Sequence, residues 1–156
     1  GFGMEVHYHN RSPVAAALEA ELAATHWPDL DAMLSEMDVV SINCPQTEDT
    51  FHLFSAERLK RMRSSAFLIN TARGGIIDEA ALVVALDDGT IAGAGLDVYE
   101  GEPTVHPGLL ALENVVLLPH LGSATVDGRI AMGDRVIDNI EAYLAGTELP
   151  DRVGSA

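Results

Sequence analysis

Cysteine, positive charge and long apolar runs are scarce in this sequence of 156 residues. Cys44 is the single cysteine, so an internal disulfide is excluded and we expect a reducing, cytoplasmic location. Lysine and arginine number 9 against 24 acidic residues, which argues against binding to nucleic acid or to anionic membranes. No apolar run has the length of a membrane span or the pattern of a signal peptide.

The length allows one domain, or part of one, and strand-like and helix-like segments alternate along it. This alternation predicts an α/β fold with a mainly parallel sheet. The predicted strands are Met4 to His9, Ala23 to Trp27, Asp38 to Asn43, Ala66 to Asn70, Ile91 to Asp97 and Val115 to Leu118. The predicted helices are Pro13 to Leu22, Asp29 to Met37, Ser55 to Met62, Asp78 to Asp87 and Thr125 to Leu144.

Three short phrases each follow a predicted strand: Asn70 to Gly75, Asp97 to Pro103 and Leu118 to Thr125. Open α/β sheets build their sites at the carboxyl ends of their strands. The phrases therefore bring an arginine, a carboxylate and a histidine to the predicted site edge.

These phrases, their order and the helix starts between them resemble the nucleotide-binding half of the D-isomer-specific 2-hydroxyacid dehydrogenases. Within that family the glyoxylate/hydroxypyruvate reductase group is the nearest likeness, and the resemblance extends from Phe2 to about Gly146. It implies hydride transfer between NAD(P)H and a small 2-keto or 2-hydroxy acid, with glyoxylate or hydroxypyruvate favoured. It also implies a homodimer in the complete protein. A phosphoglycerate-type or formate-type relative fits the same motifs, although formate oxidation does not need a histidine–glutamate pair.

Reduction of a 2-keto acid needs a cation, a proton donor and a group that orients the donor. Arg73 can hold the substrate carboxylate through two parallel hydrogen bonds. His120 can donate the proton, and Glu102 can fix its tautomer. We predict these three as the catalytic residues. Each also has a structural interpretation, as a surface ion-pair residue, a core histidine or a turn carboxylate respectively.

The turn Asn10, Arg11 and Ser12 bears on the choice of cofactor. An acidic residue after the second strand would bind the ribose hydroxyls of NAD, and none is present here, so Arg11 and Ser12 favour NADP over NAD. Alternatively, Ser12 is simply the N-cap of a helix that begins at Pro13. The resemblance implies further cofactor-binding residues at Cys44, Pro45, Thr71, Ala72, Arg73, Asp97, His120 and Gly122.

Other reactive side chains have structural interpretations. We interpret Cys44 as an apolar wall residue, because no base or basic cluster accompanies it in the sequence. His7 and His9 share one strand face without a third ligand, so no metal site is predicted. His106 precedes a proline in a polar loop and is also interpreted as structural.

A G-x-G-x-x-G turn, which opens this domain in the family, does not occur in the sequence. We therefore expect an incomplete Rossmann-like doubly wound sheet without its first strand, glycine turn and first helix. Residues 1–147 would form a partial NAD(P)-binding domain and residues 148–156 a C-terminal tail, which we expect to be frayed after Leu149. In the order 3-2-1-4-5-6 the strands at Met4 to His9 and at Asp38 to Asn43 would each have an open edge.

Such a chain by itself is expected to bind dinucleotide weakly and to turn over little. Two alternatives remain. One is a non-catalytic, dinucleotide-responsive module of the corepressor type. The other is an inert fragment that pairs with an intact homologue.

Overall fold

The computed structural model describes residues 2–154, and the chain divides into two compact units. The first unit ends at Pro119 and the second begins at His120. Within the described residues, the helices are all too short or too polar to cross a membrane.

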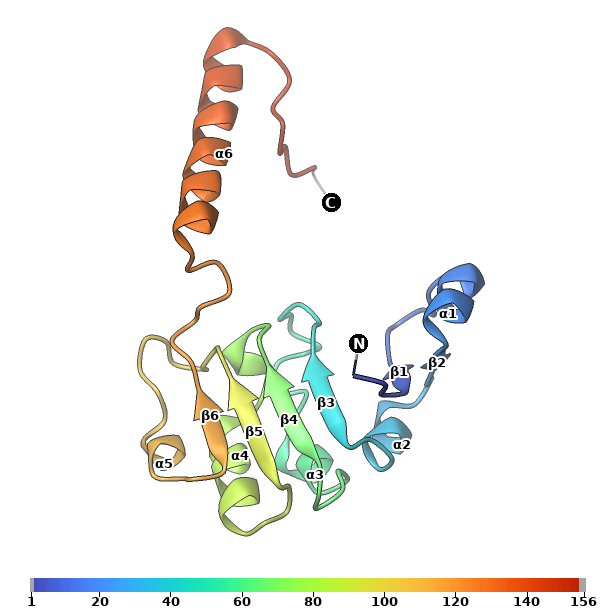
Figure 1. Cartoon of the computed structure of the whole chain (residues 1–156). Coiled ribbons are helices and arrows are strands. Elements are labelled where there is room, and N and C mark those ends of the chain that lie inside the picture. Colours follow the sequence, from blue (N-terminus) through green and yellow to red (C-terminus); the bar gives the residue numbers. More distant parts are fainter. Residues whose placement is uncertain (1, 155–156) are drawn as a thin grey trace. The chain divides into compact units, whose positions relative to one another are not determined.

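The first unit alternates strands with short helices, as predicted (Figure 1). Its elements are β1 (Val6–Tyr8), α1 (Ala16–Leu22), β2 (Ala24–His26), α2 (Leu30–Leu34), β3 (Val39–Ile42), α3 (Ala56–Leu59), β4 (Phe67–Asn70), the 3-10 helix η1 (Gly74–Ile76), α4 (Glu79–Asp87), β5 (Gly93–Leu96), α5 (Pro107–Leu110) and β6 (Val115–Leu117). All strand pairs are parallel, which confirms the α/β class.

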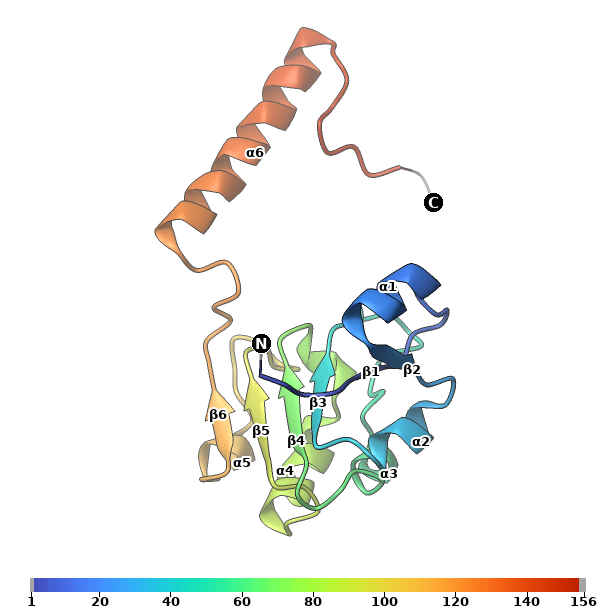
Figure 2. The ribbon, with the colours of Figure 1, turned by 45° about the vertical axis from the view of Figure 1, so that its right-hand side comes forward.

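The strands form two sheets, one of β1 and β2 and one in the order β3-β4-β5-β6 (Figure 2). Within the described residues, β1 pairs with β2 and β3 with β4, so β1 and β3 each have an edge without a strand partner. These are the two edges that the sequence predicts to be open. Exposed main-chain groups on such edges can pair with another strand.

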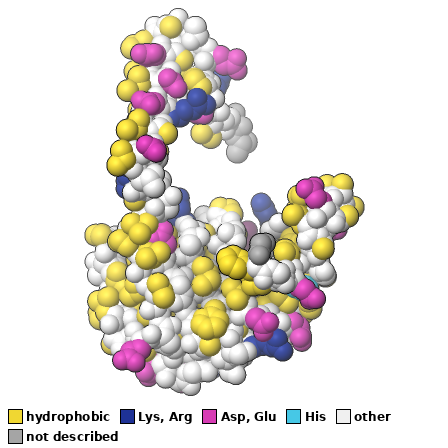
Figure 3. All heavy atoms as spheres, viewed as in Figure 1, with side chains coloured by type: hydrophobic (Ala, Val, Ile, Leu, Met, Phe, Trp, Pro, Cys, Tyr) yellow, Lys and Arg dark blue, Asp and Glu magenta, His cyan; other side chains and the backbone are white. Residues whose placement is uncertain are grey.

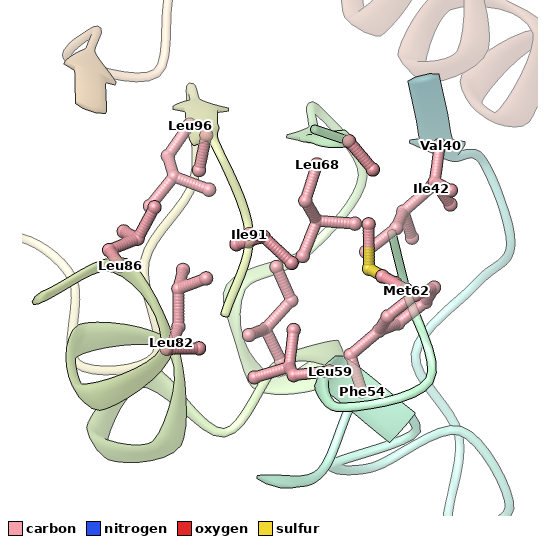
Figure 4. Close-up of a cluster of buried hydrophobic side chains, with 14 of the residues drawn as sticks. Val40, Ile42, Phe54, Leu59, Met62, Leu68, Leu82, Leu86, Ile91 and Leu96 are labelled. Atoms are coloured by element: carbon pink, nitrogen blue, oxygen red, sulfur yellow. The ribbon is translucent and has the colours of Figure 1, made fainter. Parts of the chain in front are cut away.

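The core lies on one face of the four-stranded sheet (Figure 4). Along β3, Val40 and Ile42 are buried whereas Val39 and Ser41 are exposed, so the period-2 alternation places one apolar face inward. Leu68 and Leu82 are fully buried in the same cluster. A fully buried side chain of this size contributes about 1.5–3 kcal/mol.

The other sheet face is open, and Figure 3 shows hydrophobic side chains gathered on it. Val39, Phe67 and Val116 are 47%, 48% and 63% exposed. Helices α3 and α4 lie behind the strands in the same view (Figure 1). Among the described residues, the four-stranded sheet is therefore covered by helices on one face.

Helix ends follow local sequence signals in some places and tertiary contacts in others. Asp78, where the predicted helix begins, caps α4 by accepting a hydrogen bond from the Ala81 amide at 3.0 Å. Helix α1 begins at Ala16, so the interpretation of Ser12 as an N-cap is wrong. The Tyr8 hydroxyl accepts from the Val14 amide at 2.9 Å, and this contact engages a segment that the sequence assigned to the helix.

The second unit contains one long helix, α6 (Val126–Ala145). Thr125 caps it at one end, and Gly146 ends it with a φ of 68°. Asp151 accepts hydrogen bonds from Arg135 at 2.8 Å and from Asn139 at 2.7 Å. These contacts connect Asp151, in the C-terminal tail, to α6.

Candidate functional site

The loop after β4 is shaped by the side chain of Asn70, which is 1% exposed. Its amide nitrogen donates to the Arg73 carbonyl at 2.9 Å, and its oxygen accepts from the Ala72 amide at 3.0 Å. One buried side chain thus binds the Ala72 amide and the Arg73 carbonyl, and it constrains the segment that carries Thr71, Ala72 and Arg73. The Arg73 guanidinium is exposed and donates from Nη1 to the Ala72 carbonyl at 2.6 Å.

A cleft of about 670 Å³ lies beside this loop. Its lining residues are Asn43, Cys44, Pro45, Gln46, Ala72 and Arg73. The volume is in the range of small-molecule sites, about 300–1,000 Å³. The structure thereby brings together four residues that the sequence assigned to the site, two after β3 and two after β4. Burial raises the pKa of the Cys44 thiol and so disfavours the reactive thiolate. This agrees with the interpretation of Cys44 as a small apolar residue in the lining of the site.

The loop after β5 carries Asp97 and Glu102. Asp97 is buried, and its amide donates to the Asn70 carbonyl at 3.0 Å. The Glu102 carboxylate accepts from the Tyr99 amide at 3.0 Å. The Tyr99 hydroxyl in turn donates to the Leu118 carbonyl at 2.7 Å. This loop is therefore connected to both β4 and the segment that follows β6.

The β4 and β5 loops touch each other through Gly74. A Cβ at Gly74 would lie 1.8 Å from the Tyr99 carbonyl carbon and 2.3 Å from the Glu100 nitrogen. Only glycine allows this approach, so the glycine after Arg73 is needed for close contact between the two loops. Arg73 and Glu102 consequently lie on neighbouring loops at the same edge of the sheet.

Two side chains from other parts of the chain, Glu79 and His52, contact the loop after β5. Glu79, the first residue of α4, is 5% exposed and accepts a hydrogen bond from the Glu100 amide at 2.5 Å. The Glu100 carboxylate meets His52 Nε2 at 2.8 Å. His52 has a φ of 50°, and its amide donates to the Gly75 carbonyl at 2.9 Å. A left-handed conformation is uncommon for a residue other than glycine and marks a constrained position.

The predicted cofactor turn follows β1. Asn10, Arg11 and Ser12 are all exposed, and the Asn10 carbonyl lies 3.4 Å from His26 Nε2 on β2. The Arg11 guanidinium is therefore accessible to an anionic ligand.

His120 and Gly122 lie at the start of the second unit. His120 is exposed and has a φ of 54°. Such a backbone costs about 1–3 kcal/mol and is found often at functional sites.

The remaining histidines lack the geometry of a metal site. His7 Nδ1 accepts from the Trp27 indole at 3.0 Å, and His9 Nδ1 lies 2.8 Å from the Trp27 carbonyl. His106 caps α5 by accepting from the Gly108 amide at 3.1 Å. No group of three or more potential metal ligands occurs within residues 2–154.

The sequence alone did not single out four residues near the predicted site. Asn43 and Gln46 line the cleft, and Glu79 and His52 support the β5 loop. Asn43 and Gln46 flank Cys44 and Pro45, so their position along the chain could have indicated that they line the same cleft. Glu79 and His52 are far in sequence from the loop that they contact, and no local motif marks them.

Comparison with known proteins gives a consistent result. A family model described as D-isomer specific 2-hydroxyacid dehydrogenase, NAD binding domain, matches residues 1–122. The chain is 46% identical to glyoxylate reductase of Thermococcus onnurineus, over 98% of the chain and 45% of that protein. It is 49% identical to glyoxylate/hydroxypyruvate reductase B of Yersinia pestis, over 94% of the chain and 45% of that protein.

Solved structures agree in fold. The NADPH-dependent glyoxylate/hydroxypyruvate reductase of Sinorhizobium meliloti, in complex with NADP and malonate, is 42% identical with a TM-score of 0.90. The match covers 98% of this chain and 46% of that one. D-mandelate dehydrogenase of Rhodotorula graminis is 31% identical, with a TM-score of 0.88 over 99% of this chain and 45% of its own. The chain thus spans a little under half the length of the relatives that it matches.

Proposed function

We propose a function from one premise: this chain belongs to the D-isomer specific 2-hydroxyacid dehydrogenase family, through its NAD-binding domain. The proposal is that it forms the nucleotide-binding part of an enzyme that reduces a small 2-keto acid with NAD(P)H. The observation that carries the proposal is the contact of the β4 and β5 loops at Gly74, next to the cleft. Because of this contact, Arg73 and Glu102 lie on neighbouring loops. Both loops follow the carboxyl ends of parallel strands, where open α/β sheets bind their ligands.

Arg73 would bind the substrate carboxylate, because its planar guanidinium offers two parallel donors. His120 would donate a proton from its imidazolium to the substrate carbonyl oxygen and would take that proton back in oxidation. Glu102 would serve as the carboxylate that orients the histidine and fixes its tautomer. The nicotinamide, when bound, supplies the hydride.

We assign the dinucleotide contacts to Cys44, Pro45 and Ala72 of the cleft lining. Thr71, Asp97 and Gly122 are proposed to contact the dinucleotide as well. The size of the cleft and its position at the carboxyl ends of β3 and β4 support this assignment. Asn10, Arg11 and Ser12 are proposed to bind the adenosine ribose, and Arg11 favours a 2′-phosphate. NADP is therefore the proposed cofactor, in agreement with the NADPH-dependent relative from Sinorhizobium meliloti.

Glyoxylate and hydroxypyruvate are the proposed substrates, because the names of the similar proteins specify these acids. The complete enzyme is proposed to be a cytoplasmic homodimer. The mandelate enzyme among the similar structures is the reason to test a bulkier acid as well.

The test is an assay of the complete gene product with NADPH or NADH and a panel of 2-keto acids. Glyoxylate- or hydroxypyruvate-dependent oxidation of NADPH is expected, and His120→Gln should lower its rate by at least about 100-fold. The proposal is wrong if no 2-keto acid supports oxidation of either cofactor, or if the histidine variant remains fully active.

A further inference from the structure

The buried carboxylate of Glu79 is the feature that the proposed chemistry leaves unexplained. An acidic residue in the first turn of a helix is ordinarily exposed, where it interacts with the helix dipole in water. Glu79 is 5% exposed, and Asp78 already caps the helix. Burial raises the pKa of Glu79, and the carboxylates of Glu100 and Glu102 raise it further, against a lowering contribution from the Glu100 amide. A buried carboxylate is costly unless hydrogen bonds compensate for the lost water.

The compensating contact is with the backbone of the β5 loop. Glu79 Oε1 accepts from the Glu100 amide at 2.5 Å. The preceding amide, that of Tyr99, donates to Glu102 Oε1 at 3.0 Å. Two successive amides of this loop thus bind two carboxylates, one from the helix and one from the loop itself. The hydrogen bond to Glu79 fixes the peptide that joins Tyr99 to Glu100, and a rotation of that peptide would disturb the neighbouring amide as well.

The Tyr99–Glu100 peptide is also in contact with the loop after β4, which carries Arg73. Gly74 approaches the Tyr99 carbonyl carbon and the Glu100 nitrogen closely enough to exclude any Cβ. His52 reaches the Glu100 side chain and the Gly75 carbonyl, so it supports both loops as well. Glu79 and the loop that carries Arg73 therefore both contact the Tyr99–Glu100 peptide, and the Glu102 carboxylate binds the amide of the peptide just before it.

We propose that Glu79 is a positioning residue, whose carboxylate fixes the Tyr99–Glu100 peptide and thereby the orientation of Glu102. The inference rests on the proposed function, because it assigns Glu102 a role in orienting the proton donor. Glu79 itself does not touch the reacting atoms in this scheme. Its contribution is to keep a loop in one conformation, and small displacements of a positioned group reduce turnover strongly.

The experiment compares four variants of the complete gene product. Glu79→Leu removes the acceptor at similar volume, and Glu79→Asp keeps the charge but shortens the reach. Glu79→Gln keeps the oxygen acceptor and is the conservative rescue. Glu57→Leu, in the exposed first turn of α3, is the matched control. If the leucine variant does not fold, the aspartate variant still tests whether the Glu79 carboxylate holds the Tyr99–Glu100 peptide.

Two quantities are measured on each variant. The first is deuterium uptake by the peptide that contains residues 97–103, which requires no activity. The second is kcat and KM with the best keto acid. In the leucine and aspartate variants, we expect uptake to be faster by about tenfold or more and kcat to fall by up to about 100-fold, with KM changed by less than about threefold. The glutamine variant and the Glu57 control should behave as wild type in both measurements.

Each other result overturns the inference. Unchanged deuterium uptake in the leucine and aspartate variants means that Glu79 does not hold the loop. Faster uptake with wild-type kcat means that the contact is structural and does not position Glu102. If the wild-type protein reduces no keto acid, the proposed function fails and the positioning role fails with it, whereas the uptake measurement still decides whether Glu79 holds the loop.

Discussion

Substitution of Gly74 by alanine is expected to separate the two loops of the candidate site. The added Cβ would lie 1.8 Å from the Tyr99 carbonyl carbon, 2.0 Å from its oxygen and 2.3 Å from the Glu100 nitrogen. All three are backbone atoms, so no side chain can rotate away to accept the methyl group. Moving the closest atom out to the 3.4 Å of ordinary van der Waals contact needs a shift of about 1.6 Å.

The size of the effect follows from this geometry. Adding a methyl group to a close-packed site costs about 1–3 kcal/mol, and a conflict between backbone segments belongs at the upper end of that range. We therefore expect Gly74→Ala to lower the free energy of unfolding by about 2–3 kcal/mol. For a chain of this length, each kcal/mol lowers the melting temperature by roughly 2–4 °C.

The assay is urea and thermal unfolding followed by circular dichroism, with Gly101→Ala as the matched control. Gly101 lies in the neighbouring loop, and the nearest atom to an added Cβ there is the Thr104 carbonyl oxygen at 3.8 Å. The control should change the free energy of unfolding by less than about 0.5 kcal/mol. Equal stabilities of the two variants would refute the argument that Gly74 is required by close loop contact.

Three further predictions concern charged residues. Arg73→Lys should lower kcat/KM for the keto acid about tenfold or more in steady-state assays, because a charge-assisted hydrogen bond is worth about 1.5–3 kcal/mol. Arg11→Gln should weaken NADPH binding about tenfold in calorimetric titrations and leave NADH binding unchanged. The hydrogen bond from Arg58 lowers the pKa of Asp31. The stability that this pair contributes is present above the unfolded-state pKa of about 4 and is lost as pH falls through the folded-state pKa. Asp31→Asn should therefore differ most from wild type near neutral pH in urea unfolding.

Much of the fold could be predicted because it depends on local signals. The end of α6 at Gly146 and the cap at Asp78 follow from single residues with clear conformational preferences. The glycines of β5 also carry a local signal, because glycine allows close approach of another backbone. A Cβ added at Gly93 would lie 2.8 Å from the Asn114 carbonyl oxygen. The family resemblance drawn from the three phrases is confirmed by the family model.

The rest depends on contacts between distant parts of the chain. Helix α1 begins at Ala16, three residues later than predicted, and the Val14 amide in the intervening segment donates to the Tyr8 hydroxyl. No pattern within residues 12–16 indicates that contact. The role of Glu79 depends on the path of a loop 21 residues further along. Helix α5 was not predicted because it spans only Pro107–Leu110, too short for a periodic apolar pattern.

The central claim is that this chain supplies the nucleotide site and the Arg73, Glu102 and His120 chemistry of a 2-hydroxyacid dehydrogenase. The most direct measurement is the absorbance of NADPH during incubation of the complete gene product with glyoxylate, for wild type and for His120→Gln side by side. The account predicts steady oxidation by the wild type and a loss of at least about 100-fold in the variant, the usual contribution of a general acid. No oxidation by the wild type, or equal rates in both proteins, would contradict it.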